Sequence, residues 1–138
     1  MSKHIINRES LTKAMREAVA ERGESWTYPS LSDAGDSKWR NSFGNCVYAF
    51  PDGSPACLIG LALYKIDPTI DLVGAENRIA TEHDDTSVMA LFKELGVEDR
   101  VLYNAAASAQ RRQDRGQSWG SALEAYETSI RQWGGRNV

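Results

Sequence analysis

Three arginines near the carboxyl end of the chain have the spacing of an anion-binding site. Arg111, Arg112 and Arg115 lie close together, and Arg111 and Arg115 would share one face of a helix. A guanidinium group binds carboxylate or phosphate through two parallel hydrogen bonds, which a lysine ammonium cannot do. The pattern indicates a site for a small anion. A solvated helix face explains the same residues and is the commoner explanation for any single arginine.

A second cluster of suitable residues lies in the middle of the chain. Lys38, Trp39, Arg40 and Asn41 place two cations, an aromatic ring and an amide side by side. They fall in a polar stretch, residues 30–44, that reads as a long loop, and long loops in compact domains are often functional. An aromatic ring can stack on a nucleotide base, and arginine adds a cation–π contact. We expect these four residues to converge with the three arginines on one ligand.

The charge distribution sets the carboxyl-terminal region apart. Residues 1–99 carry ten Lys or Arg and sixteen Asp or Glu, whereas residues 100–138 carry six Arg and three acids. The whole chain has a net charge of −3. Binding to duplex nucleic acid normally needs a broad basic face, so the acidic total argues against that function.

Catalytic and metal chemistry have little support in the sequence. The cysteines and histidines, Cys46, Cys57, His4 and His83, lack the close spacing of a zinc site. His83-Asp84 is similar to a metal phosphohydrolase doublet, but the further histidines of such a site are missing. No nucleophile elbow, P-loop or dinucleotide fingerprint occurs. We therefore expect a protein that is not an enzyme and has no cofactor or metal, with both cysteines reduced and packed in the core.

The elements that would position these residues are mostly helices. Apolar periodicity and capping residues predict helices over residues 8–22, 87–95 and 98–113, a buried helix ending near Ile66, and a last helix capped by Ser118. Residues 75–81 predict a further helical turn. Gly116 and Gly120 bracket Ser118-Trp119, which predicts a fixed corner between the last two helices.

Two short segments predict strands. Trp26 to Tyr28 alternates and ends at Pro29, and residues 46–50 alternate β-formers before the turn residues 51–54. Beyond the turn, either Ser54 caps a helix or residues 56–58 pair back as a short second strand, and we favour the second. The expected fold class is α+β: a helix-dominated single domain, residues 1–138, with a small antiparallel β-hairpin.

The sequence predicts a cytoplasmic protein. No apolar run reaches the roughly 18 residues that a membrane span requires. The first residues lack the apolar core and cleavage site of a signal peptide.

Parts of the chain resemble small uncharacterised actinobacteriophage proteins. The likeness is carried by Cys46-Val-Tyr48, by Asp52-Gly-x-Pro-x-Cys57-Leu-Ile-Gly60-x-Ala-Leu63, and by Gln113-Asp-x-Gly-x-x-Trp-Gly-x-Ala-Leu123. These motifs are structural and not catalytic. The resemblance implies a phage accessory protein that acts in the cytoplasm of an infected bacterium against host functions or host defence.

These observations lead to two main hypotheses. The first is a non-catalytic binder, expected to be a homo-oligomer, that sequesters a small anionic ligand such as a cyclic nucleotide. Its predicted ligand-binding residues are the two clusters described above. The second is a protein–protein inhibitor of a host enzyme. An enzyme, the third alternative, would need a metal or an acid–base pair that the sequence does not display.

Overall fold

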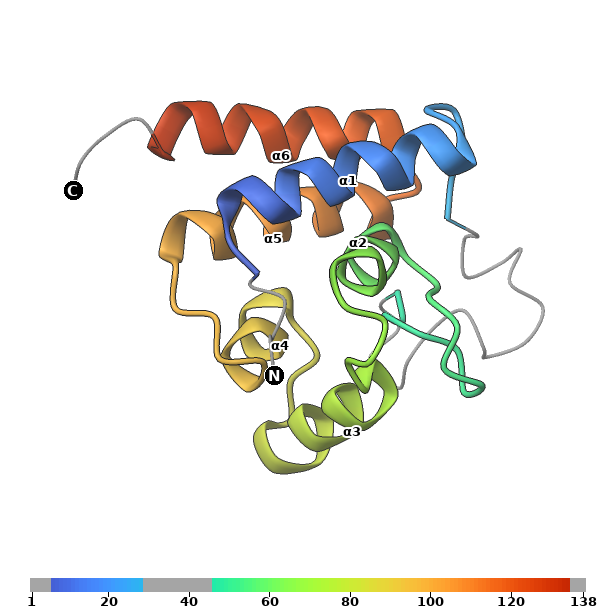
Figure 1. The fold of residues 1–138 in the computed structure, drawn as a ribbon, viewed down its shortest axis with the longest axis vertical. Helices are drawn as coiled ribbons and strands as arrows, with labels where there is room; N and C mark the ends of the chain where they lie inside the picture. The colour runs from blue at the N-terminus through green and yellow to red at the C-terminus, as the bar shows by residue number, and fades with distance from the viewer. Residues whose placement is uncertain (1–5, 29–45, 135–138) are drawn as a thin grey trace.

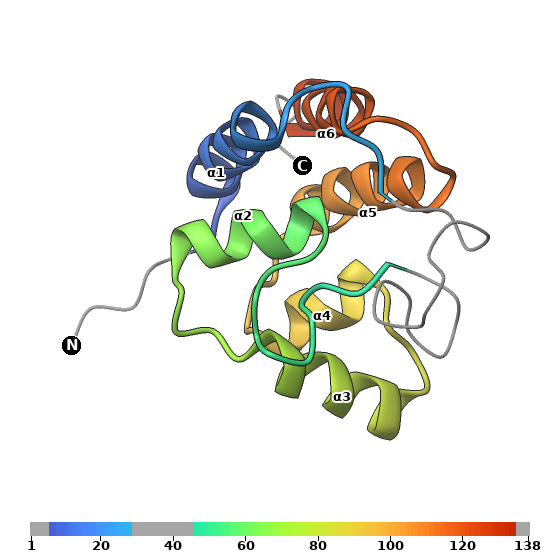
Figure 2. The same ribbon diagram turned by 90° about the vertical axis from the view of Figure 1, so that its right-hand side faces the viewer.

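The protein is a bundle of helices in the computed structural model, which describes residues 6–28 and 46–134. Its helices are α1 (Arg8–Arg22), α2 (Leu58–Ile66), α3 (Leu72–His83), α4 (Val88–Glu94), α5 (Arg100–Asp114) and α6 (Trp119–Gly134). Figure 1 shows α1, α5 and α6 at one end of the molecule and α3 at the other. In Figure 2 the helices form three layers: α1 with α6, α2 with α5, and α3 with α4.

Helix α1 shows how local sequence sets an element's bounds. The Asn7 side chain accepts the Ser10 backbone N–H at 2.8 Å, and the Ser10 hydroxyl accepts the Asn7 N–H at 2.9 Å. This reciprocal cap begins the helix. Gly23, at φ 104°, ends it in a conformation that other residues rarely adopt. Leu11 and Met15 are fully buried on the inner face, so the prediction of a helix over residues 8–22 is confirmed.

The prediction of an α+β fold is wrong, because the described part of the chain is all-α and contains no sheet or hairpin. Two isolated antiparallel bridges, Thr27↔Ser118 and Ala49↔Pro55, lie where strands were expected. The turn after Phe50 does form, with the Phe50 N–H donating to the Ser54 carbonyl at 2.8 Å. However, α2 begins at Leu58 and leaves too few residues for a second strand to pair.

Side chains take the place of the missing strand partner. The backbone N–H of Cys46 donates to the Asp114 carboxylate at 3.2 Å, and that of Tyr48 donates to the buried Glu76 carboxylate at 3.1 Å. Hydrogen bonds to a charged acceptor are stronger than those to a neutral one. The buried polar groups of this segment are therefore satisfied by α3 and α5, and a β-ladder is not needed.

The start of α2 is attached to the end of α5. Cys57 is the N-cap of α2, and its sulfur accepts the Gly60 N–H at 3.4 Å. The next free N–H, that of Leu58, donates to the Gln113 amide oxygen at 3.0 Å. The Gln113 amide nitrogen in turn donates to Gln110 at 3.0 Å. These contacts attach the carboxyl-terminal part of α5 to the start of α2, while α6 packs along α5.

An arginine packed against two indole rings that contact each other edge to face fixes the start of α6. The guanidinium carbon of Arg22 lies 4.8 Å from the Trp26 ring centroid and 4.9 Å from that of Trp119. The same group donates to the Ala56 carbonyl at 3.0 Å. The backbone N–H of Trp119 donates to the backbone carbonyl of Trp26 at 2.8 Å. The corner before α6 is therefore held by α1, and the prediction of a fixed junction near Ser118-Trp119 is consistent with these contacts.

Candidate functional site

A groove of about 440 Å³ runs between α5 and α6 and contains all three predicted arginines. The two helices are joined by the short connection 115–118 and lie side by side in Figures 1 and 2. The groove is lined by Ser108, Arg111, Arg112, Arg115, Glu124, Ala125, Thr128, Ser129, Gln132 and Trp133. Its α5 wall is cationic, and its α6 wall is mainly neutral and polar.

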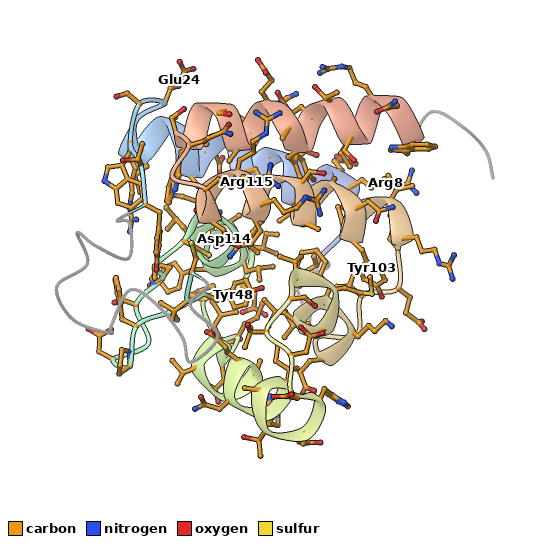
Figure 3. The ribbon with its side chains drawn as sticks, turned by 180° about the vertical axis from the view of Figure 1, so that it is seen from behind. Arg8, Glu24, Tyr48, Tyr103, Asp114 and Arg115 are labelled. Atoms are coloured by element: carbon orange, nitrogen blue, oxygen red, sulfur yellow. The ribbon has the colours of Figure 1, made fainter. Side chains whose placement is uncertain are left out.

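The three arginines differ in how firmly they are held. Arg112 donates to the Ser121 hydroxyl at 2.7 Å and to the Gln117 amide oxygen at 3.3 Å, so it also braces the corner between the helices. Arg111 donates to the Ser108 hydroxyl at 3.2 Å. Arg115 follows the last residue of α5 and is exposed. Figure 3 places Arg115 beside α5 and α6, away from Tyr48.

None of these arginines has a carboxylate partner within 4.0 Å among residues 6–28 and 46–134. Four cations elsewhere in the described residues do form ion pairs: Arg8, Arg16, Lys65 and Arg78. Arg8 contacts Asp99 at 2.7 Å, and Arg78 contacts Glu94 at 2.7 Å. The carboxyl end of a helix favours positive charge, which accounts for the presence of cations there. It does not account for three guanidinium groups gathered at one groove whose lining includes a single carboxylate, that of Glu124.

The structure adds residues that the sequence analysis did not single out. Glu124 brings a carboxylate into the same groove, and Trp133 lies at its far end with 44% of its surface exposed. Trp133 continues the three- and four-residue spacing of Trp119, Tyr126 and Ile130. That spacing assigns it to the buried stripe, so the sequence held no signal that would mark it as a surface residue.

The other predicted cluster lies outside the described residues. Lys38, Trp39, Arg40 and Asn41 all fall within positions 29–45. Their expected convergence with the arginines of α5 therefore stays a prediction.

A second groove, of about 620 Å³, borders the other side of α6. Its charged side chains are mostly acidic: Glu24, Glu124 and Glu127 against a single cation, Arg131. Glu127 is paired with Arg16. Carboxylates repel an anionic ligand, so the larger groove suits such a ligand less well than the groove between α5 and α6.

Neither cysteine has the environment of a nucleophile. Cys46 and Cys57 are both reduced and buried, as expected for packing residues. Burial raises the pKa of the Cys57 thiol to about 12, so the reactive thiolate form is negligible near neutral pH. Across the described ranges, no three His, Cys, Asp or Glu side chains are grouped so as to hold a metal ion.

Comparisons with known protein families, with curated proteins and with solved structures found no match to this chain. Within the described helices, none combines the length and the apolar character required to cross a membrane.

Proposed function

We propose that this protein is a non-catalytic binder that sequesters a small anionic, nucleotide-like ligand in the groove between α5 and α6. The observation that carries the proposal is the set of three arginines without carboxylate partners, Arg111, Arg112 and Arg115, on one wall of a groove. With Glu124 as the one acid lining the groove, the lining keeps a net positive charge. An anion of two or more charges fits this balance.

The groove is built for capture and not for turnover. Its arginines keep their charge at any physiological pH and so cannot act as acids or bases there. The remaining polar lining consists of hydroxyls, an amide and one carboxylate, with no histidine or cysteine among them. Such a set can orient a ligand but does not pair a nucleophile with a base.

The biological setting of the proposal comes from the resemblance to actinobacteriophage proteins. A phage accessory protein of this kind would act in the cytoplasm of the infected bacterium. There it would lower the concentration of a nucleotide signal of host defence. We propose a homo-oligomer for this role, because a second copy would supply more of the contacts that a small ligand needs for tight binding.

The experiment is calorimetric titration of the protein with mononucleotides and cyclic nucleotides, combined with native mass spectrometry. Arg111→Ala with Arg115→Ala removes the two cations that do not brace the helix corner. Lys13→Ala with Lys93→Ala removes the same charge from exposed positions on α1 and α4. We expect at least one nucleotide to bind, the first double variant to lose about 100-fold in affinity, and the control to bind normally. Absence of binding across the panel contradicts the proposal.

The same samples test a protein–protein inhibitor as the alternative. Tyr64 and Met89 are large apolar side chains with 44% and 45% of their surface exposed, on α2 and α4. Exposed apolar residues favour contact with another protein only where they form a contiguous patch, so a host partner would have to cover both positions. Recovery of one stoichiometric host enzyme, by a protein that binds no nucleotide, would support this alternative over the binder.

A further inference from the structure

The groove between α5 and α6 has two chemically different ends. The helices are antiparallel, because a short connection joins them and they pack along their length. The arginines and Glu124 lie toward the connection, and Trp133 lies in the last turn of α6. Nine residues separate Glu124 from Trp133, which corresponds to about 13 Å along the helix axis. A compact anion such as phosphate would contact the cationic end alone.

Neutral polar side chains line the middle of the groove. Ser108 lines it from α5 and Thr128 from α6, where Thr128 also accepts a hydrogen bond from Arg131 at 3.2 Å, and Gln132 lines the groove next to Trp133. The Ser108 hydroxyl already accepts a hydrogen bond from Arg111 and donates one to the Asn104 carbonyl at 2.9 Å. The amide of Gln132, which is exposed, can both donate and accept. These groups match the hydroxyls of a sugar better than further phosphates, which would favour additional cations.

The third feature of the groove is an exposed indole ring, that of Trp133. Trp133 keeps 44% of its surface accessible at the end of the groove, whereas Trp119 of the same helix is fully buried. Stacking of a base on an aromatic side chain strengthens binding and does not depend on which base is present. A tryptophan at the far end of a cationic groove is therefore suited to a planar ring attached to the anion.

We infer that the ligand is a nucleoside phosphate bound lengthwise, with its phosphate groups between Arg111 and Arg115, its sugar beside Thr128 and Gln132, and its base stacked on Trp133. This inference rests on the proposed function and specifies the ligand class and its direction in the groove. Trp133 is then the residue that separates nucleotides from inorganic anions, and the arginines bind both.

The test compares adenosine diphosphate with inorganic pyrophosphate by calorimetry, because the two share a diphosphate group and differ in the nucleoside. We expect the protein to bind adenosine diphosphate at least ten-fold more tightly. Trp133→Ala should abolish this difference while the affinity for pyrophosphate changes less than two-fold, and Trp133→Phe should retain most of it. Arg111→Ala with Arg115→Ala should weaken both ligands.

The outcomes distinguish a failure of the lengthwise arrangement from a failure of anion capture itself. If the protein binds both ligands equally, or if Trp133→Ala leaves the difference intact, the lengthwise arrangement is wrong and anion capture stands. If neither ligand nor any other nucleotide binds, the proposed function fails and this inference fails with it. Circular dichroism of each variant shows whether the fold is retained, and Trp133→Phe preserves an aromatic ring if Trp133→Ala unfolds.

Discussion

The Gly60 backbone lies directly against the carbonyl group of Tyr48. A Cβ atom at position 60 would be 1.8 Å from the Tyr48 carbonyl oxygen and 2.8 Å from its carbon. That oxygen accepts the Ala56 N–H at 3.0 Å. Both contacts involve backbone atoms, which cannot turn aside as a flexible side chain can. The close approach joins the first turn of α2 to segment 46–50.

Gly60→Ala is therefore expected to destabilise the protein by about 3 kcal/mol or more, since the backbone must shift to admit the methyl group. Urea denaturation followed by circular dichroism measures the change. Gly53→Ala is the comparison, because nothing lies within 4 Å of its added Cβ and its positive φ of 91° is the main cost, about 1 kcal/mol. Equal effects of the two substitutions would contradict the close packing of Gly60.

Arg22→Lys tests the cluster of Arg22, Trp26 and Trp119. A lysine ammonium keeps the charge but loses the guanidinium group that contacts both rings and donates to the Ala56 carbonyl. We expect a loss of about 1–2 kcal/mol in the free energy of unfolding. Arg16→Lys on the same helix is the matched control, because Arg16 forms an exposed pair with Glu127 and should change stability by less than about 0.5 kcal/mol. A neutral result for Arg22→Lys would show that the charge alone suffices.

The contact between Arg8 and Asp99 predicts a pH dependence of stability. The hydrogen bond from Arg8, aided by the Leu102 and Val101 N–H groups, lowers the pKa of the Asp99 carboxyl below its ordinary value of 3.8. The unfolded chain therefore takes up the proton first as the pH falls. The stabilisation is fully present above that ordinary value and disappears as the pH drops through the lowered one.

The measurement is a series of thermal melts of the parent protein and of Asp99→Asn, which still caps α5. The parent should be more stable at neutral pH, and the difference should shrink as the pH falls below about 4. A difference that stays constant from neutral pH to pH 2 would contradict the assignment to Asp99.

Glu124 shares the groove with the arginines, so its carboxylate repels the anion that they attract. Glu124→Gln is expected to tighten binding of pyrophosphate by about two- to five-fold. Glu82→Gln, an exposed position on α3 at the opposite end of the molecule in Figure 1, removes the same charge and should leave the affinity unchanged. Weaker binding after Glu124→Gln would mean that Glu124 contacts the ligand or positions an arginine.

Local signals in the sequence predicted the helices well and the strands poorly. Asn7 and Gly23 mark the two ends of α1, and the apolar spacing identified α5 and α6. Both signals are local, because caps and periodicity act within a few residues. Residues 46–50 alternate like a strand, yet their N–H groups are accepted by Glu76 and Asp114. These partners lie 28 and 68 residues away from the donors they bind, and no local pattern reveals such a contact.

The candidate site was predicted in part. The spacing of Arg111, Arg112 and Arg115 placed them together at one helix end, and in the structure all three line one groove. Their role in ligand binding stays a prediction. The opposite wall comes from α6, and its position depends on tertiary packing of the two helices. For that reason the sequence analysis missed Glu124 and Trp133. The expected convergence of the three arginines and residues 38–41 on one ligand stays a prediction.

We propose that the guanidinium groups of the α5–α6 groove, which have no carboxylate partner among the described residues, bind an anion. The most direct test is the affinity for pyrophosphate of the parent protein and of Arg111→Ala with Arg115→Ala, measured by calorimetry at two salt concentrations. We expect the double variant to bind about 100-fold more weakly and to show a smaller salt dependence than the parent. Equal affinity and equal salt dependence in the two proteins would contradict the account.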